Sequence, residues 1–107
     1  MNKLLKSILV SAMLLAVGST VASADVAKGQ KLYLKKLKSS CGMTGAKMAS
    51  QHSQYEWESI KKEGKLADEL KRICPKASSG SLDDKYLEHY YDFFYEYAND
   101  SGNVPSC

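Results

Sequence analysis

The sequence of 107 residues lacks the patterns of two large structural classes. It contains no apolar run of the roughly twenty residues that a helix needs to cross a bilayer. It also has no stretch in which apolar and polar residues alternate, which is the usual pattern of a half-buried strand. These absences argue against a membrane-spanning segment and predict an all-α protein without a sheet.

Patterns that carry common chemistry are also missing. The three cysteines form no Cys-x-x-Cys motif, the usual signature of a disulfide oxidoreductase. The cysteines and the two histidines lack the close paired spacing of a structural zinc site. No nucleophile stands out together with a base and an orienting acid. We therefore expect neither an enzyme nor a metal centre.

The first residues have the composition of an export signal. Lys3 and Lys6 precede an apolar run from Ile8 to Val17, and small residues follow up to Ala24. This arrangement predicts a signal peptide over residues 1–24, cleaved after about Ala24, and a periplasmic domain over residues 25–107. After cleavage, no contact with the membrane is expected.

The net charge of the complete chain is small. It is +3 at pH 7, and removal of Lys3 and Lys6 with the signal peptide lowers it to about +1. A nucleic-acid-binding domain is usually much more basic, so nucleic acid is not an expected partner. In the oxidising periplasm, the three cysteines are candidates for disulfide bonds.

A first amphipathic helix is predicted from Val26 to Leu37. Val26, Tyr33 and Leu37 recur at helical spacing, with the small Gly29 on the same face. The opposite face is basic and carries Lys28, Lys31, Lys35 and Lys38. Two glycines and small polar residues then predict a loop over residues 39–45.

The middle of the chain carries clear helix signals. Ser53 and Glu56 match a capping box, which predicts a helix that begins directly after Ser53. The helix is expected to break near Gly64 and to resume over residues 66–73. Pro75 ends it, because proline cannot continue the backbone hydrogen-bond ladder.

The last predicted helix is rich in aromatic residues. Ser81 and Asp84 suggest its start, and its pattern continues to about Asn99, before a tail from about Ser101. An apolar stripe at three- and four-residue steps consists of Tyr86, Leu87, Tyr90, Phe93, Phe94 and Tyr97. Tyr90, Tyr91 and Tyr95 cannot all face one core, so the exposed ones are candidates for a binding surface.

Three of these features together resemble class I cytochrome c. Gly29 lies four residues before Tyr33, a Gly-x-x-Gly loop follows at Gly42 and Gly45, and the last helix is aromatic. In that family the first and last helices cross closely at the glycine. The resemblance therefore implies a small domain of three to four helices. Its crossing would be formed by Gly29, Tyr33, Phe94 and Tyr97.

The residues at the haem positions of that family are replaced here. The family motif is Cys-x-x-Cys-His, and alignment on the two loop glycines places Leu37, Ser40 and Cys41 on these functional positions. Cys74, followed by Pro75, stands where the second axial ligand would be. The resemblance thus implies that the covalent haem site is lost and that no cofactor is bound. The alternative is a non-covalent haem, with ligands among Cys41, Met43, Met48, His52 and His89.

The resemblance also suggests a disulfide. The two axial residues of a cytochrome face each other, so Cys41 and Cys74 are expected to come within bonding range if no haem separates them. Such a bond would stabilise the domain where the cofactor otherwise does. Pairing of Cys107 with either cysteine is also compatible with the sequence, and three cysteines always leave one unpaired.

Three functions follow from this reasoning. The first is a disulfide-stapled binding or accessory module for a periplasmic partner, such as a redox enzyme. The second is an electron-transfer cytochrome that holds haem in an atypical way. The third is a thiol-exchange protein that uses the unpaired cysteine, which would also permit a covalent dimer.

Overall fold

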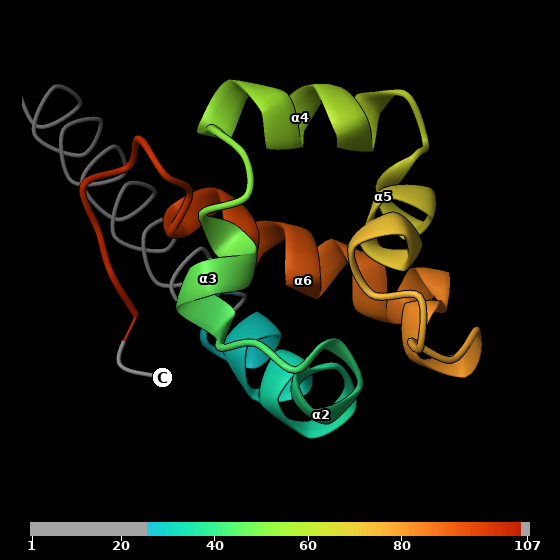
Figure 1. Cartoon of the computed structure of the whole chain (residues 1–107). Helices are drawn as coiled ribbons and strands as arrows, with labels where there is room; N and C mark the ends of the chain where they lie inside the picture. Colours follow the sequence, from blue (N-terminus) through green and yellow to red (C-terminus); the bar gives the residue numbers. More distant parts are fainter. Residues whose placement is uncertain (1–25, 106–107) are drawn as a thin grey trace, which may run out of the picture.

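The computed structural model describes residues 26–105, so the predicted signal peptide and Cys107 lie outside the described part (Figure 1). Residues 26–105 are helical and contain no strand, which confirms the predicted all-α class. No helix within this range is long and apolar enough to cross a membrane. After the helix over residues 26–36 come α2 (Lys38–Cys41), α3 (Gly45–Ala49), α4 (Gln54–Lys62), α5 (Leu66–Ile73), the 3₁₀ helix η1 (Gly80–Leu82) and α6 (Asp84–Glu96).

The capping box predicted at the start of α4 is confirmed. The Ser53 hydroxyl accepts a hydrogen bond from the Glu56 backbone N–H at 3.2 Å, and the Glu56 carboxylate accepts one from the Ser53 N–H at 2.9 Å. The break near Gly64 is also present, with φ of 70° at this glycine. Only glycine adopts this left-handed conformation without strain, so α4 and α5 turn relative to each other there.

Three sequence predictions about element boundaries were wrong. The segment 39–45, predicted as a loop, contains the end of α2 and the first residue of α3. The N-cap of α6 is Asp83, whose carboxylate accepts from the Lys85 N–H at 3.3 Å, whereas Ser81 belongs to η1. Helix α6 ends at Glu96 rather than near Asn99, because the Asn99 N–H donates to the His52 carbonyl at 3.1 Å instead of continuing the helix.

The first and last helices cross at Gly29. A methyl group at this position would overlap the His89 carbonyl oxygen and would lie 2.9 Å from Cβ of Phe93. Tyr33 is fully buried one turn later, with its ring 6.0 Å from Phe93 and 6.1 Å from Phe94. Tyr97 is half-buried and packs on Phe93 at 5.4 Å, so Phe93 is the central contact of the crossing.

Among the described residues, the five largest fully buried side chains are aromatic: Trp57, Tyr33, Tyr90, Phe93 and Phe94. Tyr90 is fully buried, and its hydroxyl donates to the Ser81 carbonyl at 2.8 Å. Burial raises the pKa of Tyr90 to about 12. Tyr90 therefore does not belong to a binding surface, which corrects one candidate. Tyr91 is half-buried under Lys61, whose Nζ lies 4.3 Å from the ring centroid, while Tyr95 is 36 % exposed.

Candidate functional site

A disulfide joins the ends of two helices. Cys41 is the last residue of α2 and Cys74 is the C-cap of α5, and their Cα atoms lie 4.8 Å apart across 33 positions of sequence. Cys74 is 1 % exposed and Cys41 is half-buried. This is the pairing that the resemblance implied. The third cysteine, Cys107, lies outside the described residues.

The local backbone brings both cysteines to places where the chain turns. Gly42 follows Cys41 with φ of 63°, and its N–H donates to the Lys38 carbonyl at 2.9 Å, which ends α2. The Cys74 N–H donates to the Leu70 carbonyl at 2.8 Å, and Pro75 prevents a further turn. The ends of two helices therefore meet, and the disulfide closes them.

The disulfide belongs to the apolar core, since Cys74 is part of the buried cluster and Cys41 packs against it. Trp57 is fully buried, its indole N–H donates to the Ala49 carbonyl at 2.9 Å, and its ring stacks on Phe94 at 4.8 Å. The other large, fully buried side chains in this cluster include Leu37, Met48 and Leu70. Such tight filling gives this part of the molecule a well-defined core.

The residues present do not fit a haem at the positions that the resemblance implied. Cys41 and Cys74 are bonded to each other, so neither sulfur is free to ligate an iron. Their Cα atoms are 4.8 Å apart, which leaves no room for a porphyrin between the two side chains. At the two attachment positions, Leu37 is a buried core residue and Ser40 is half-buried, and neither forms a thioether.

The remaining candidate haem ligands have other surroundings. Met48 is fully buried in the core, and the Met43 carbonyl accepts from the Tyr33 hydroxyl at 2.8 Å. His89 is half-buried on α6, and its Nδ1 has no hydrogen-bond partner among residues 26–105. Among the residues that the structure describes, no group of three or more His, Cys, Asp and Glu side chains is placed to hold a metal ion.

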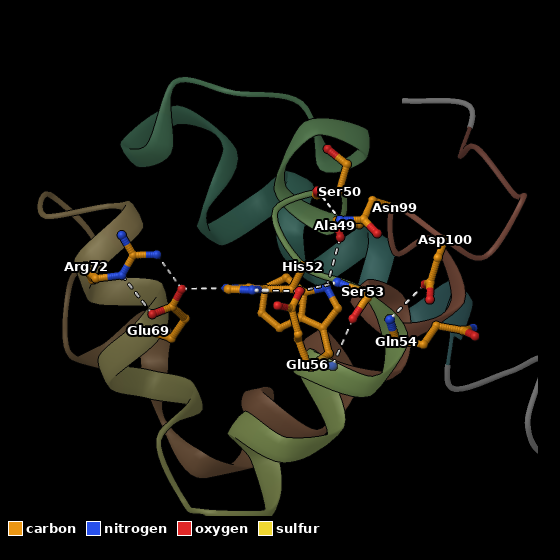
Figure 2. Close-up of polar contacts among 11 residues, drawn as sticks. Ala49, Ser50, His52, Ser53, Gln54, Glu56, Glu69, Arg72, Asn99 and Asp100 are labelled. Atoms are coloured by element: carbon orange, nitrogen blue, oxygen red, sulfur yellow. Dashed lines mark hydrogen bonds and ion pairs between the residues drawn. The ribbon is translucent and has the colours of Figure 1, made fainter.

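His52 lies at the centre of a polar cluster that the sequence did not reveal (Figure 2). Its Nε2 lies 2.6 Å from Oε2 of Glu69, and its Nδ1 lies 3.6 Å from Oε1 of Glu56. Arg72 also belongs to this cluster, because its Nε donates to Oε1 of Glu69 at 2.9 Å. The His52 ring stands edge-on to Trp57 at 4.8 Å. The cluster therefore connects the segment before α4 to α5 over the core tryptophan.

The carboxylates of this cluster are stabilised in their charged form. Hydrogen bonds from Arg72 are the largest cause that lowers the pKa of Glu69 to about 2, and His52 adds to the effect. The pKa of Glu56 is also lowered, chiefly by its hydrogen bond from the Ser53 backbone. Both effects follow from donors that favour the carboxylate over the acid. The ionised carboxylates of the cluster therefore help to hold α4 and the segment before it against α5.

Polar contacts also attach the segment after α6 to Ser50 and to the start of α4 (Figure 2). The Gln54 N–H donates to the Asp100 carboxylate at 2.9 Å, and the Asn99 amide donates to the Ser50 carbonyl at 3.3 Å. Local signals existed for two parts of these networks, the capping box of Ser53 and Glu56 and the three-residue spacing of Glu69 and Arg72 on one helix. Partners separated by 17 or 46 positions have no such signal.

Comparisons with known proteins give no relative for this chain, since no family model, no curated protein and no solved structure matches it.

Proposed function

We propose that this chain is an exported helical domain that binds another periplasmic protein and in which a disulfide takes the structural place of a covalent haem. The Cys41–Cys74 bond carries this proposal, because it joins the two residues that stand at the axial positions of the resembling family. An electron carrier needs those positions for iron ligands. A binding module needs only a rigid frame, which the disulfide and the aromatic core supply.

The surface supports binding more than catalysis. Among the described residues, the large apolar side chains that remain exposed include Leu34 at 38 % and Tyr55 at 75 %. His52 is the one imidazole engaged by carboxylates on both nitrogens, and its contacts within residues 26–105 connect elements rather than activate a nucleophile. Exposed apolar side chains on a rigid scaffold are typical of protein–protein contact sites.

A visible absorption spectrum tests the absence of haem. The chain is expressed with its own first residues in cells that mature c-type cytochromes, and it is recovered from the periplasmic fraction. We expect no Soret band. A Soret band in stoichiometric amount after purification would contradict the proposal and favour the electron carrier.

Crosslinking in the periplasm tests the binding function. A photo-crosslinking amino acid is placed at Tyr55 or Leu34, and a matched position at Lys76 on the surface serves as control. We expect one reproducible adduct from a binding-surface position and none from the control. The same adducts at all positions, or none at all, would contradict a specific partner.

A second candidate function, thiol exchange, is favoured by one observation. The bond between Cys41 and Cys74 leaves Cys107 as the unpaired cysteine of the chain. Trapping of free thiols in acid, followed by non-reducing electrophoresis, would reveal a mixed disulfide that Cys107→Ser abolishes. A free Cys107 thiol without adducts would exclude this function.

A further inference from the structure

The charges of this chain are unevenly distributed. No acidic residue occurs over residues 26–55, whereas acids outnumber basic residues over residues 56–105. The acid-free stretch contains Lys28, Lys31, Lys35, Lys36, Lys38 and Lys47. It forms the helix over residues 26–36 together with α2 and α3, which lie next to one another in Figure 1. Net positive charge is therefore concentrated in these three elements.

The lysines lie on the face of the first helix that points away from the core. Gly29, Tyr33 and Leu37 are buried on the inner face. The outer face of this helix is exposed and carries Lys28, Lys31, Leu34 and Lys35, and the exposed Lys38 follows at the start of α2. We call these five residues the basic face. Within residues 26–105, none of these lysines forms an ion pair, whereas Lys62 and Lys65 in the acidic part do.

An apolar groove opens beside the basic face. Leu34, Lys38 and Met43 line a shallow surface pocket of about 420 Å³ together with Ser39, Gly42 and Thr44. Gly42 leaves it open, because no atom lies within 4 Å of the position that a Cβ would take there. Leu34 is 38 % exposed and lies between Lys31, Lys35 and Lys38 on this face. The groove has the size for one or two aliphatic side chains.

We propose that the basic face binds an acidic segment of a periplasmic protein and that an apolar side chain of this segment enters the groove. This inference rests on the proposed function and adds to it the binding site and the kind of partner. Lysines that form no ion pair within residues 26–105 attract an acidic segment over a distance of about 10 Å at moderate salt. The apolar contact with Leu34 and Met43 then fixes its position. A recess for single side chains suits a protein segment better than a flat lipid surface.

Nuclear magnetic resonance tests the site directly. The ¹⁵N-labelled chain, recovered from the periplasm, is titrated with a peptide that alternates glutamate pairs with single leucines. We expect saturable shifts that concentrate on residues 31–47 and weaken as salt is added. A peptide with lysine in place of glutamate, and one with serine in place of leucine, are the controls. Shifts that spread over the whole chain, or no saturation, would overturn the proposal.

Two sets of variants distinguish the contribution of the lysine charges from that of the apolar groove. In the first, Lys31→Gln, Lys35→Gln and Lys38→Gln are combined, and we expect affinity to fall by about tenfold. The matched control neutralises the same number of exposed lysines in the acidic part, through Lys62→Gln, Lys65→Gln and Lys76→Gln. In the second set, Leu34→Ser weakens binding, and Val104→Ser, which replaces another exposed apolar side chain far along the chain, does not. Equal effects of test and control variants would overturn the proposal.

Two other occupants of the same face give different results. If the basic face binds lipid, the chain sediments with phosphatidylglycerol vesicles in a Leu34-dependent manner and does not bind the peptide. If it binds a second copy, sedimentation velocity shows oligomers that the triple lysine variant disrupts. Either result overturns the proposal of an acidic protein segment.

The crosslinking experiment of the proposed function separates the two claims. An adduct that forms equally well with the triple lysine variant supports a binding function and overturns the basic face as its site. Peptide binding to the basic face without any adduct in the periplasm supports the site and contradicts the binding function.

Discussion

Single residues decide how closely the helices of this domain approach. Gly29 is the strongest case, since its missing side chain lets the first helix contact the His89 backbone. Glycine in a helix normally costs about 0.5 to 1 kcal/mol relative to alanine. At position 29 the close packing of the two helices offsets this cost, so a change from glycine to alanine should destabilise the domain instead of stabilising it.

We expect Gly29→Ala to destabilise the domain by about 1 to 3 kcal/mol, because the added methyl group forces the two helices apart. Urea unfolding followed by circular dichroism measures the effect. Gly80→Ala is the control, since a Cβ at Gly80 has no atom within 4 Å. Equal stability of both variants would contradict the crossing.

Glu69 provides a second prediction at this scale. Its side chain is 15 % exposed and receives hydrogen bonds from His52 and Arg72, so Glu69→Gln should lower stability at pH 7 by about 1 to 3 kcal/mol. Its pKa is lowered from 4.5 to about 2. The stabilisation is therefore complete above pH 4.5 and is lost as the pH falls toward 2.

Unfolding of both forms between pH 7 and pH 2 tests this prediction. The difference between native chain and Glu69→Gln should shrink through this range. Glu63→Gln, which removes an exposed carboxylate 3.8 Å from Lys65, should change stability little at any pH. A difference that stays constant down to pH 2 would show that the charge of Glu69 is not involved.

At the scale of elements, local signals were accurate where one or two neighbouring residues decide a boundary. The capping box of α4, the turn at Gly64 and the stop at Pro75 were predicted from the sequence for this reason. The short helices α2 and α3 were not predicted, because helices of four or five residues depend on tertiary packing rather than on their own sequence. The end of α6 was misplaced because Asn99 bonds to a residue far away in sequence.

The capping box gives a quantitative prediction for α4. Ser53→Ala removes the acceptor for the Glu56 N–H and should destabilise the domain by about 1 kcal/mol. Ser59→Ala, the same substitution in the interior of α4, should be neutral or slightly stabilising, because alanine is the better helix former. Thermal unfolding of the two variants separates capping from general effects of the side chain. A similar loss in both would argue against the cap.

At the scale of the whole molecule, the disulfide could be expected only from the resemblance. Spacing alone leaves all three pairings of Cys41, Cys74 and Cys107 open, because any of these loops can close in some fold. The His52 cluster had no comparable guide. Its partners come from separate elements that only the complete packing of residues 26–105 brings together.

The disulfide should be the largest single contribution to stability in this small domain. Its loop closes 33 positions, and the chain-entropy account gives about 3 to 4 kcal/mol for a loop of this length. We expect the double variant Cys41→Ala, Cys74→Ala, or reduction by dithiothreitol, to lower stability by this amount. Since small domains have little stability in reserve, the reduced chain should be partly unfolded at 37 °C.

Cys107→Ala is the control and should unfold like the native chain. A thiol count in denaturant without reductant should give one free thiol. If Cys107→Ala were as unstable as the double variant, the pairing would have to involve Cys107, and the disulfide would no longer stand at the axial positions on which the proposed function depends.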